Sequence, residues 1–361
     1  MKMKNDLTRI FVTLVSSILV LTLFSGTPKE AKGEEILTIG FASRSLGCAW
    51  WQAFTQAGEE WGKNRDDVEL ITRVAEDNVV TQSKIIDSFI ERGVDGIILQ
   101  CVDSAGVVPA VDRAIKAGIP VATVDVDANH PDIAFFVAFG NEKIAKQAGE
   151  VMVEKLIEKN GVPKGTILEL DTVLGMEVTT LRAKGFKKVM DQYENINVIR
   201  KPAQSHEGKA LQMARDFLQA REIDGIYGLG QPLTIGGFKA LKSLGLAKKI
   251  GEKGHIIIVG IDGGPRLNKL VKEGWIDVVL DQPTTDYVPL TGDLLVEYIR
   301  KGSGVIPSEG EIIEEEGAMW SPAVIRTSFG HPYVQTAGFL ITPETADNPK
   351  LWGNIMAEEQ E

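Results

Sequence analysis

Residues 91–98 read ERGVDGII and join the end of an amphipathic segment to a short apolar run. The amphipathic segment, residues 79–92, is predicted as a helix because it stops at Gly93 and carries an apolar face. That face consists of Ile85, Ile86, Phe89 and Ile90. The run after Gly93 has the composition of a buried strand. The stretch therefore predicts a helix-turn-strand unit of a parallel sheet.

The same alternation continues along the chain. Short runs rich in β-branched residues alternate with amphipathic segments, of which residues 143–159 are a second clear example. This order predicts an α/β fold built on parallel sheets. The expected strands lie at residues 37–43, 69–74, 96–100, 121–125 and 134–139, and then at 166–171, 198–201, 225–229, 256–262 and 276–280.

An internal echo divides these strands into two groups. Residues 220–227 read AREIDGIY and repeat the pattern of residues 91–98, and each copy is followed by a helix and a strand ending at Asp125 or Asp262. Asp-Gly turns before buried strands also recur by chance in α/β proteins. The matched order of the two copies favours two doubly wound parallel-sheet lobes of the same topology. A ligand would then bind beyond the carboxyl ends of their strands.

The two lobes are expected to be joined by a hinge that the chain crosses several times. The predicted crossings lie near residues 139–141, near 282–284 and in the stretch after Lys301. Residues 318–336 find no place in this scheme, whereas residues 339–342, FLIT, are typical of a final strand returning to a lobe. We assign residues 34–139 and about 283–303 to the N-terminal lobe, residues 140–282 and part of 304–345 to the C-terminal lobe, and residues 346–361 to a tail.

The N-terminus has the features of a secretory signal peptide, which we assign to residues 1–33. Three basic residues precede an apolar run at residues 10–24, and small residues follow it. The alternative is an uncleaved membrane anchor, but the run is shorter than the roughly 20 residues that span a bilayer. No cysteine for acylation follows directly. The sequence therefore predicts an exported, periplasmic protein.

Charge and composition exclude several classes of function. Removing residues 1–33 leaves 34 basic and 48 acidic residues, a net charge of about −14 that opposes nucleic-acid binding. The three residues Gly228, Leu229 and Gly230 begin like a dinucleotide motif, but Leu233 stands where its third glycine is required. No metal site is expected from the histidines, which are scattered at His130, His206, His255 and His331. We expect no catalysis, no cofactor and no metal.

Five short stretches carry a resemblance to a known family. They are IGF at 39–41 leading to Trp50 and Trp51, GIPV at 118–121 leading to Asp125, RAKGF at 182–186, VGIDG at 259–263, and DQP at 281–283. In this order they resemble the type I periplasmic sugar-binding proteins, the ribose- and galactose-binding family of ABC importers, over nearly the whole chain after residue 33. The resemblance implies a monomer that captures a sugar or polyol and delivers it to a membrane permease.

Sugar chemistry supports the same positions independently. A sugar presents many hydroxyls and an apolar C–H face, so its site needs carboxylates or amides, a guanidinium and an aromatic ring. Asp125 and Asp262 would accept hydrogen bonds from hydroxyls, and Arg182 would donate to ring or hydroxyl oxygens. Trp50 matches a position at which the family stacks a ring on the sugar, and Trp51 is its neighbour, although a Trp pair that opens a helix could equally belong to the core.

Departures from the ribose pattern make ribose itself doubtful. Val126 stands where ribose binders have Arg, Ser205 where they have an aromatic residue, and Gly230 where they have Asn. Gln231 could replace that missing amide, and either Asp281 or Gln282 could fill the family's Gln position before the hinge. With at least two carboxylates expected in the site, a neutral polyhydroxylated ligand fits better than an anion.

Two further alternatives concern the cysteines and the role in the cell. Cys48 and Cys101 follow neighbouring strands of the 2-1-3-4-5 order, so an exported chain could join them in a disulfide, the alternative being two separate buried thiols. We predict the disulfide.

The alternative to transport is a sensory receptor for a sugar or sugar-like signal. A sugar-responsive repressor of the same fold is excluded by the signal peptide, the acidic charge and the lack of a helix-turn-helix.

Overall fold

The computed structural model describes residues 35–171 and 177–358. The predicted signal peptide at residues 1–33 and the last three residues of the predicted tail lie outside the described residues. Within these ranges, no helix combines the length and the apolar character needed to cross a bilayer.

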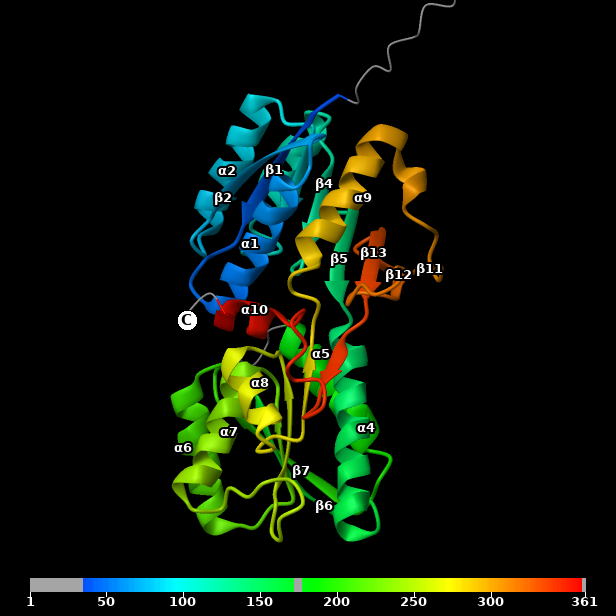
Figure 1. The fold of residues 1–361 in the computed structure, drawn as a ribbon. Coiled ribbons are helices and arrows are strands. Elements are labelled where there is room, and N and C mark those ends of the chain that lie inside the picture. The colour runs from blue at the N-terminus through cyan, green and yellow to red at the C-terminus, as the bar shows by residue number, and fades with distance from the viewer. Residues whose placement is uncertain (1–34, 172–176, 359–361) are drawn as a thin grey trace, which may run out of the picture. The chain divides into compact units, whose positions relative to one another are not determined.

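The first sheet contains the first five strands of the chain in the predicted order (Figure 1). Its order β2-β1-β3-β4-β5 is the 2-1-3-4-5 order expected from the sequence, and all four pairs are parallel. β1 and β3 are buried along almost their whole length because helices cover both faces. The strands are β1 Leu37–Ser43, β2 Val68–Val74, β3 Gly96–Leu99, β4 Val121–Val124 and β5 Phe135–Phe139.

Four helices flank this sheet. α2 (Val79–Arg92) has the predicted bounds: the Asn78 side chain accepts from the amides of its first turn, and Gly93 ends it in the left-handed conformation at φ 71°. α9 (Tyr287–Lys301) comes from far along the chain and packs against α1, β3 and β4. The other two helices are α1 Ala49–Lys63 and α3 Val108–Lys116.

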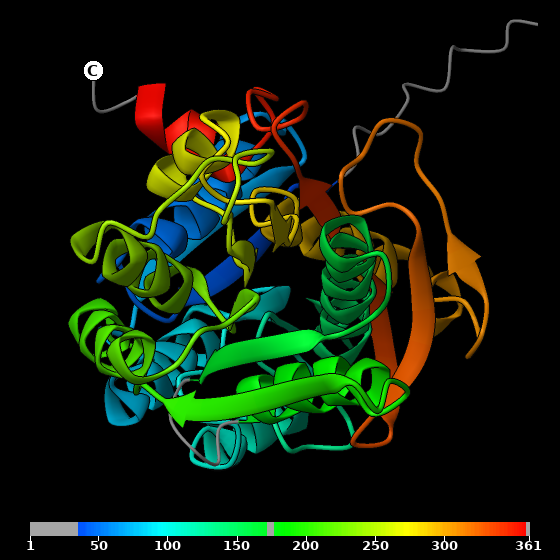
Figure 2. The same cartoon turned by 90° about the horizontal axis from the view of Figure 1, so that it is seen from below.

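The second sheet repeats this topology. Its order β7-β6-β8-β9-β10 is again 2-1-3-4-5 in chain order, and β14 is added antiparallel to β10 at the edge. α4 packs with α5 and against β9 and β10, whereas α7 packs with α6 and against β6, β8 and β9, so helices lie on both faces (Figure 2). The prediction of two lobes with like topology is therefore confirmed. The strands are β6 Gly165–Asp171, β7 Ile196–Pro202, β8 Gly225–Gly228, β9 Ile257–Ile261, β10 Val278–Asp281 and β14 Phe339–Ile341; the helices are α4 Asn141–Asn160, α5 Glu177–Met190, α6 Glu207–Ala220, α7 Gln231–Ser243 and α8 Pro265–Lys272.

The segment after α9 extends the first sheet. A short 3-10 turn, Ser303–Val305, leads to β11 (Ile312–Ile313), β12 (Ala323–Ser328) and β13 (His331–Thr336), and β13 pairs parallel with β5. His331 binds Asp127 through Nε2 at 3.0 Å, which fixes the new strands to the loop after β4. Residues 318–336, which had no place in the sequence scheme, thus form the outer part of the first sheet.

Three connections join the sheets. The chain passes from β5 to α4, from β10 to α9 and from β13 to β14, and a last helix, α10 (Trp352–Glu358), follows β14. The Tyr287 hydroxyl ties the first two connections together because it accepts from the Phe139 amide at 3.1 Å and donates to Gln282 Oε1 at 2.9 Å. Tyr333 Oη donates to the Phe139 carbonyl at 2.9 Å. Two tyrosines of the first lobe, the buried Tyr287 and the half-buried Tyr333, therefore make hydrogen bonds at the crossing points.

The predicted disulfide is not formed. Cys48 and Cys101 are both free thiols: Cys48 is exposed just before α1, and Cys101 is buried. Strands β1 and β3 are neighbours as expected, but Cys101 packs in the apolar cluster of α2 and α3, whereas α1 packs with α9. Strand adjacency alone does not bring side chains together when they belong to different helix layers.

Candidate functional site

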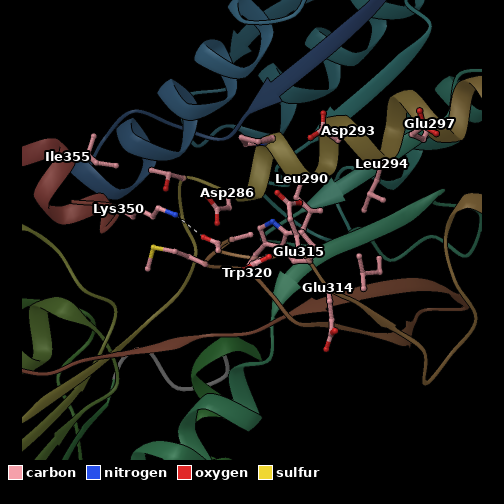
Figure 3. Close-up of a pocket in the computed structure, with 17 residues that line it drawn as sticks. Asp286, Leu290, Asp293, Leu294, Glu297, Glu314, Glu315, Trp320, Lys350 and Ile355 are labelled. Carbon is pink, nitrogen blue, oxygen red and sulfur yellow. Dashed lines mark hydrogen bonds between the residues drawn. The ribbon is translucent and has the colours of Figure 1, made fainter. Parts of the chain in front are cut away.

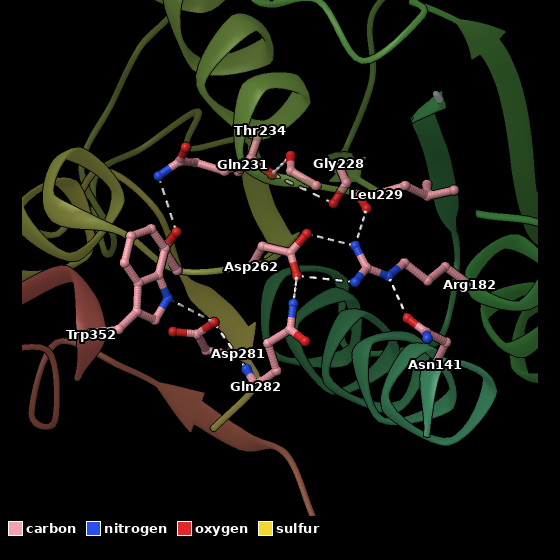
Figure 4. A network of polar contacts seen from close by, with 12 residues as sticks. Asn141, Arg182, Gly228, Leu229, Gln231, Thr234, Asp262, Asp281, Gln282 and Trp352 are labelled. Atoms are coloured by element: carbon pink, nitrogen blue, oxygen red, sulfur yellow. Dashed lines mark hydrogen bonds and ion pairs between the residues drawn. The ribbon is translucent and has the colours of Figure 1, made fainter. Parts of the chain in front are cut away.

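Arg182 and Asp262 form an ion pair through two parallel hydrogen bonds, with the arginine buried and the aspartate partly exposed (Figure 4). Arg182 lies on α5 with 6% of its side chain exposed, and Asp262 directly follows β9 with 21% exposed. The two terminal nitrogens of Arg182 donate to Asp262 Oδ2 at 2.6 Å and to Asp262 Oδ1 at 3.0 Å. This parallel geometry fixes both side chains more firmly than a single contact would.

The remaining contacts of Arg182 hold the guanidinium from several sides. Nε donates to Asn141 Oδ1 at 2.9 Å, and a terminal nitrogen donates to the Leu229 carbonyl at 2.8 Å. The Phe139 ring centroid lies 5.6 Å from the guanidinium carbon. Burial opposes the charge, but the pairing with Asp262 outweighs it and raises the pKa of Arg182 above its usual value.

Gln282 links this pair to the hinge. Its Nε2 donates to Asp262 Oδ1 at 3.0 Å, and its Oε1 accepts from Tyr287. Gln282 lies in the connection from β10 to α9 and is 6% exposed. The Gln282 side chain therefore connects Tyr287 at the hinge to the Asp262 carboxylate by two hydrogen bonds.

Asp125 has the same backbone position in the first lobe as Asp262 in the second. Each follows the fourth strand of its sheet, each has φ 65°, and each amide donates at 2.9 Å to the neighbouring strand, at Val137 or Leu280. Aspartate tolerates this left-handed conformation better than most residues. The matched geometry supports the two-copy interpretation of the sequence echo.

The Asp125 carboxylate has different surroundings. Its side-chain partner is Gln100, which donates through Nε2 to Oδ2 at 3.1 Å. Burial raises the pKa of Asp125 to about 6, against the opposing effects of Gln100, Arg44 and Arg182. The Asp262 charge also raises the pKa of Asp125, so the Asp125 carboxylate responds to a charge that belongs to the other lobe.

Asp281 and Gln231 lie near the Arg182–Asp262 pair, but their hydrogen bonds go to other residues. Asp281 is fully buried, and its Oδ1 accepts from the Gln282 amide at 2.9 Å and from Trp352 Nε1 at 3.4 Å. Burial raises the pKa of Asp281 to about 7. Gln231, at the start of α7, donates to the Gly263 carbonyl at 3.0 Å. Of the two sequence candidates before the hinge, Gln282 is the one that contacts Asp262 directly.

The two predicted tryptophans have different surroundings. Trp50 stacks on Phe54 with centroids 5.4 Å apart and packs beside Ala53 and Trp352. Its indole Nε1 is buried and has no hydrogen-bond partner among the described residues. Trp51 lies under the Arg44 guanidinium at 5.1 Å.

Sequence reasoning missed Gln100, Asn141 and Tyr287. Gln100 directly follows β3, so the rule that selected Asp125 after β4 would also have selected it. Asn141 opens α4 and Tyr287 opens α9, and nothing in their local sequence distinguishes them from ordinary helix residues.

A large groove lies elsewhere on the protein. It measures about 720 Å³ and lies between α9 and the segment 313–320 (Figure 3). Its rim is acidic, with Asp293, Glu297 and Glu314 to Glu316, and no residue of the Arg182 network lines it. We therefore choose the candidate site on its converging polar contacts and not on the volume of this groove. Within the described ranges, no cluster of three or more His, Cys, Asp and Glu could hold a metal ion.

Comparison with known proteins gives a family match. The model of the family described as periplasmic binding protein domain matches residues 39–303. The ribose import binding protein of Bacillus subtilis is 25% identical over 281 residues, 74% of this chain and 87% of that protein. The galactofuranose-binding protein of Escherichia coli is 28% identical over 276 residues, 74% of this chain and 83% of that protein.

Solved structures show the same fold. An ABC transporter solute-binding protein of Bacillus halodurans, solved with bound myo-inositol, aligns with a TM-score of 0.68 at 22% identity, covering 89% of this chain and 99% of that one. One of Actinobacillus succinogenes, solved with bound D-allose, aligns with a TM-score of 0.67 at 22% identity, covering 86% and 99%.

Proposed function

The chain belongs to the family of periplasmic binding protein domains, and we propose that it is the solute-binding protein of an ABC importer that captures a sugar or polyol between its lobes. The family consists of solute-binding proteins, not enzymes. The relatives are import binding proteins, so the alternative of a sensory receptor is not favoured.

The observation that carries this function is the Arg182–Asp262–Gln282 network, whose Asp262 and Arg182 charges both act on the pKa of Asp125 in the first lobe. Asp262 is held in one orientation by two partners, so it needs no reorganisation to accept a hydroxyl hydrogen. Arg182 uses four of its five N–H groups in the bonds described above, which leaves one for a ligand oxygen. Arg182 therefore serves mainly to fix Asp262.

The charges of the site favour a neutral ligand. Asp125 and Asp262 both present carboxylate oxygens, and a sugar or polyol hydroxyl can donate to either. An anion would meet two negative groups against one guanidinium that is already paired. Trp50 supplies the aromatic surface for the apolar C–H face of the ligand, and Gln231 is the nearby amide we assign to a further hydroxyl.

Capture requires both lobes at once. Asp125 comes from the first lobe, and Arg182 and Asp262 come from the second. A ligand that bonds to both sets favours the closed arrangement because only that arrangement satisfies all of its hydroxyls. The Tyr287 and Gln282 contact at the hinge would transmit this closure.

The family implies a protein exported to the periplasm, and we infer that residues 1–33 direct that export. The partner on the membrane is the permease of the importer. We also propose that the exported chain is monomeric and binds no nucleic acid, in line with its acidic composition.

A thermal-shift screen tests this function. Pentoses, hexoses and polyols, with D-ribose, D-allose, xylitol and myo-inositol among them, are added to the purified chain lacking residues 1–33. A true ligand at 100 times its dissociation constant stabilises the fold by roughly 2.7 kcal/mol. The Asp262→Asn variant is the control and should lose the shift. If no neutral polyol shifts the melting temperature, or if a bound sugar is chemically converted, the proposal is wrong.

A further inference from the structure

The last helix, α10, lies against both lobes (Figure 1). It packs on α8 of the second lobe and on α1 of the first. The family match ends at residue 303, so α10 lies outside the part of the chain that the match covers. α10 therefore contacts both lobes through residues that the family match does not include.

On the second lobe, α10 is fixed to the turn that follows Asp262. Asn268 donates through Nδ2 to Asn354 Oδ1 at 3.0 Å. Gly353 lies directly on Gly264: a β-carbon added to Gly353 would lie 2.5 Å from the Gly264 carbonyl carbon. A side chain cannot be accommodated there without moving the helix away.

Trp352 touches the two loops that carry the binding groups (Figure 4). The side chain is 2% exposed. Its Nε1 donates at 3.4 Å to Asp281, the residue before Gln282, and a β-carbon added to Gly264 would lie 3.0 Å from its Cη2. One indole ring therefore packs against the ends of both β9 and β10.

On the first lobe, the same ring and Met356 form a small apolar cluster with Ala53 of α1. Trp50, the proposed aromatic surface of the site, packs against this cluster. Met356 is 6% exposed. The cluster thus joins the helix that carries Trp50 to the loops that carry Asp262 and Gln282.

We propose that Trp352 is a positioning residue of the sugar site, through which α10 holds the Asp262 and Gln282 loops in place and fastens them to α1 of the first lobe. The assignment of these residues to a sugar site rests on the proposed function. The mechanical part, that α10 orders two loops and bridges two lobes, does not, and it can be measured without a ligand.

Hydrogen–deuterium exchange of the ligand-free protein tests the first half. In Trp352→Ala, the amides of Gly264 and Gln282, which donate to Asn268 and Asp281, should exchange at least about tenfold faster. Trp352→Phe keeps an aromatic ring and should restore most of the protection. The amides of β2 serve as an internal control and should not change. Unchanged exchange at Gly264 and Gln282 in Trp352→Ala contradicts the proposal.

Distance measurements between the lobes test the second half. Spin labels at Lys63→Cys on α1 and Lys269→Cys on α8, in a Cys48→Ser background, report the lobe separation by pulsed electron resonance. Met356→Asp places a charge in the α1 contact and should broaden the distances toward longer values. Ala357→Asp adds the same charge to the same helix outside the cluster and should leave the distances as in the parent protein. Identical distributions for Met356→Asp and the parent overturn the bridge.

The two proposals can fail separately. If Trp352→Ala fails to fold, Met356→Asp still decides the inference, because it removes only the α1 part of the contact. If no sugar or polyol shifts the melting temperature of the parent protein while exchange and distances respond as described, the proposed function fails and the role of α10 stands. If D-ribose, D-allose, xylitol or myo-inositol binds, its affinity should fall at least about tenfold in Met356→Asp, because the lobes then start farther apart.

Discussion

Asp125 and Asp262 have the same backbone geometry in the two lobes but very different partners. Both have φ 65° after the fourth strand of their sheet. Asp262 is held by the Arg182 guanidinium and the Gln282 amide, whereas Asp125 is bonded by Gln100 and carries a pKa raised to about 6 by burial. The repeated fold thus places one carboxylate at the same position in each lobe. Asp262 is already held in a fixed orientation by its neighbours, whereas Asp125 has a single side-chain donor. We infer that the second lobe orients the ligand. Asp125 then stabilises the closed arrangement, because it accepts a ligand hydroxyl only when the lobes close.

Removing Asp262 should have the largest effect. Asp262→Ala leaves Arg182 buried without its counter-charge, which should lower the free energy of unfolding by roughly 3–5 kcal/mol. The loss of ligand affinity should reach roughly 2–5 kcal/mol. Urea unfolding and calorimetric titration measure the two losses. An Asp262→Ala protein as stable as the parent would show that the pair does not hold the second lobe's half of the site.

Removing Asp125 should separate binding from stability. Asp125→Ala loses one amide contact and no ion pair, so unfolding should change by less than about 1 kcal/mol, while affinity falls by roughly 1.5–3 kcal/mol. The same two measurements apply. Equal losses of stability in the Asp125 and Asp262 variants would contradict the claim that only the carboxylate of the second lobe belongs to a stabilising ion pair.

The fold was more predictable from sequence than the site. Strands at residues 37–43 and the helix at 79–92 were predicted with their observed bounds, because buried apolar periodicity and the Gly93 stop are local signals. Asp125, Arg182 and Asp262 were selected by position. Which of Asp281 and Gln282 contacts Asp262 was not predictable, because that depends on the strand's exact end. The contacts of Trp352 join segments about seventy residues apart, and no local pattern records them.

Binding should weaken in acid through Asp125. Burial raises the pKa of this carboxyl to about 6, and it accepts hydroxyl hydrogens fully only when ionised. Affinity should therefore be full above that pH and fall by up to about tenfold for each unit below it. Titrations of the parent and of Asp125→Asn between pH 4.5 and 8 compare the two. An identical pH dependence in both proteins would assign the titration to another group.

The smallest expected effect concerns the aromatic ring. Trp50→Ala should lower affinity by roughly 0.5–1.5 kcal/mol and should reduce the ligand-induced change in tryptophan fluorescence. Trp51→Ala is the matched control, because Trp51 lies under Arg44 instead. If the two substitutions weaken binding equally, Trp50 is not the specific sugar-facing ring.

Small-angle scattering with the sugar or polyol found in the screen tests the central claim most directly. The claim is that one ligand bridges Asp125 of the first lobe and the Arg182–Asp262 pair of the second. The parent protein should become more compact on saturation, whereas Asp125→Asn should stay folded and should no longer compact when the same ligand is bound. Compaction of Asp125→Asn to the extent of the parent, at unchanged affinity, would contradict the account.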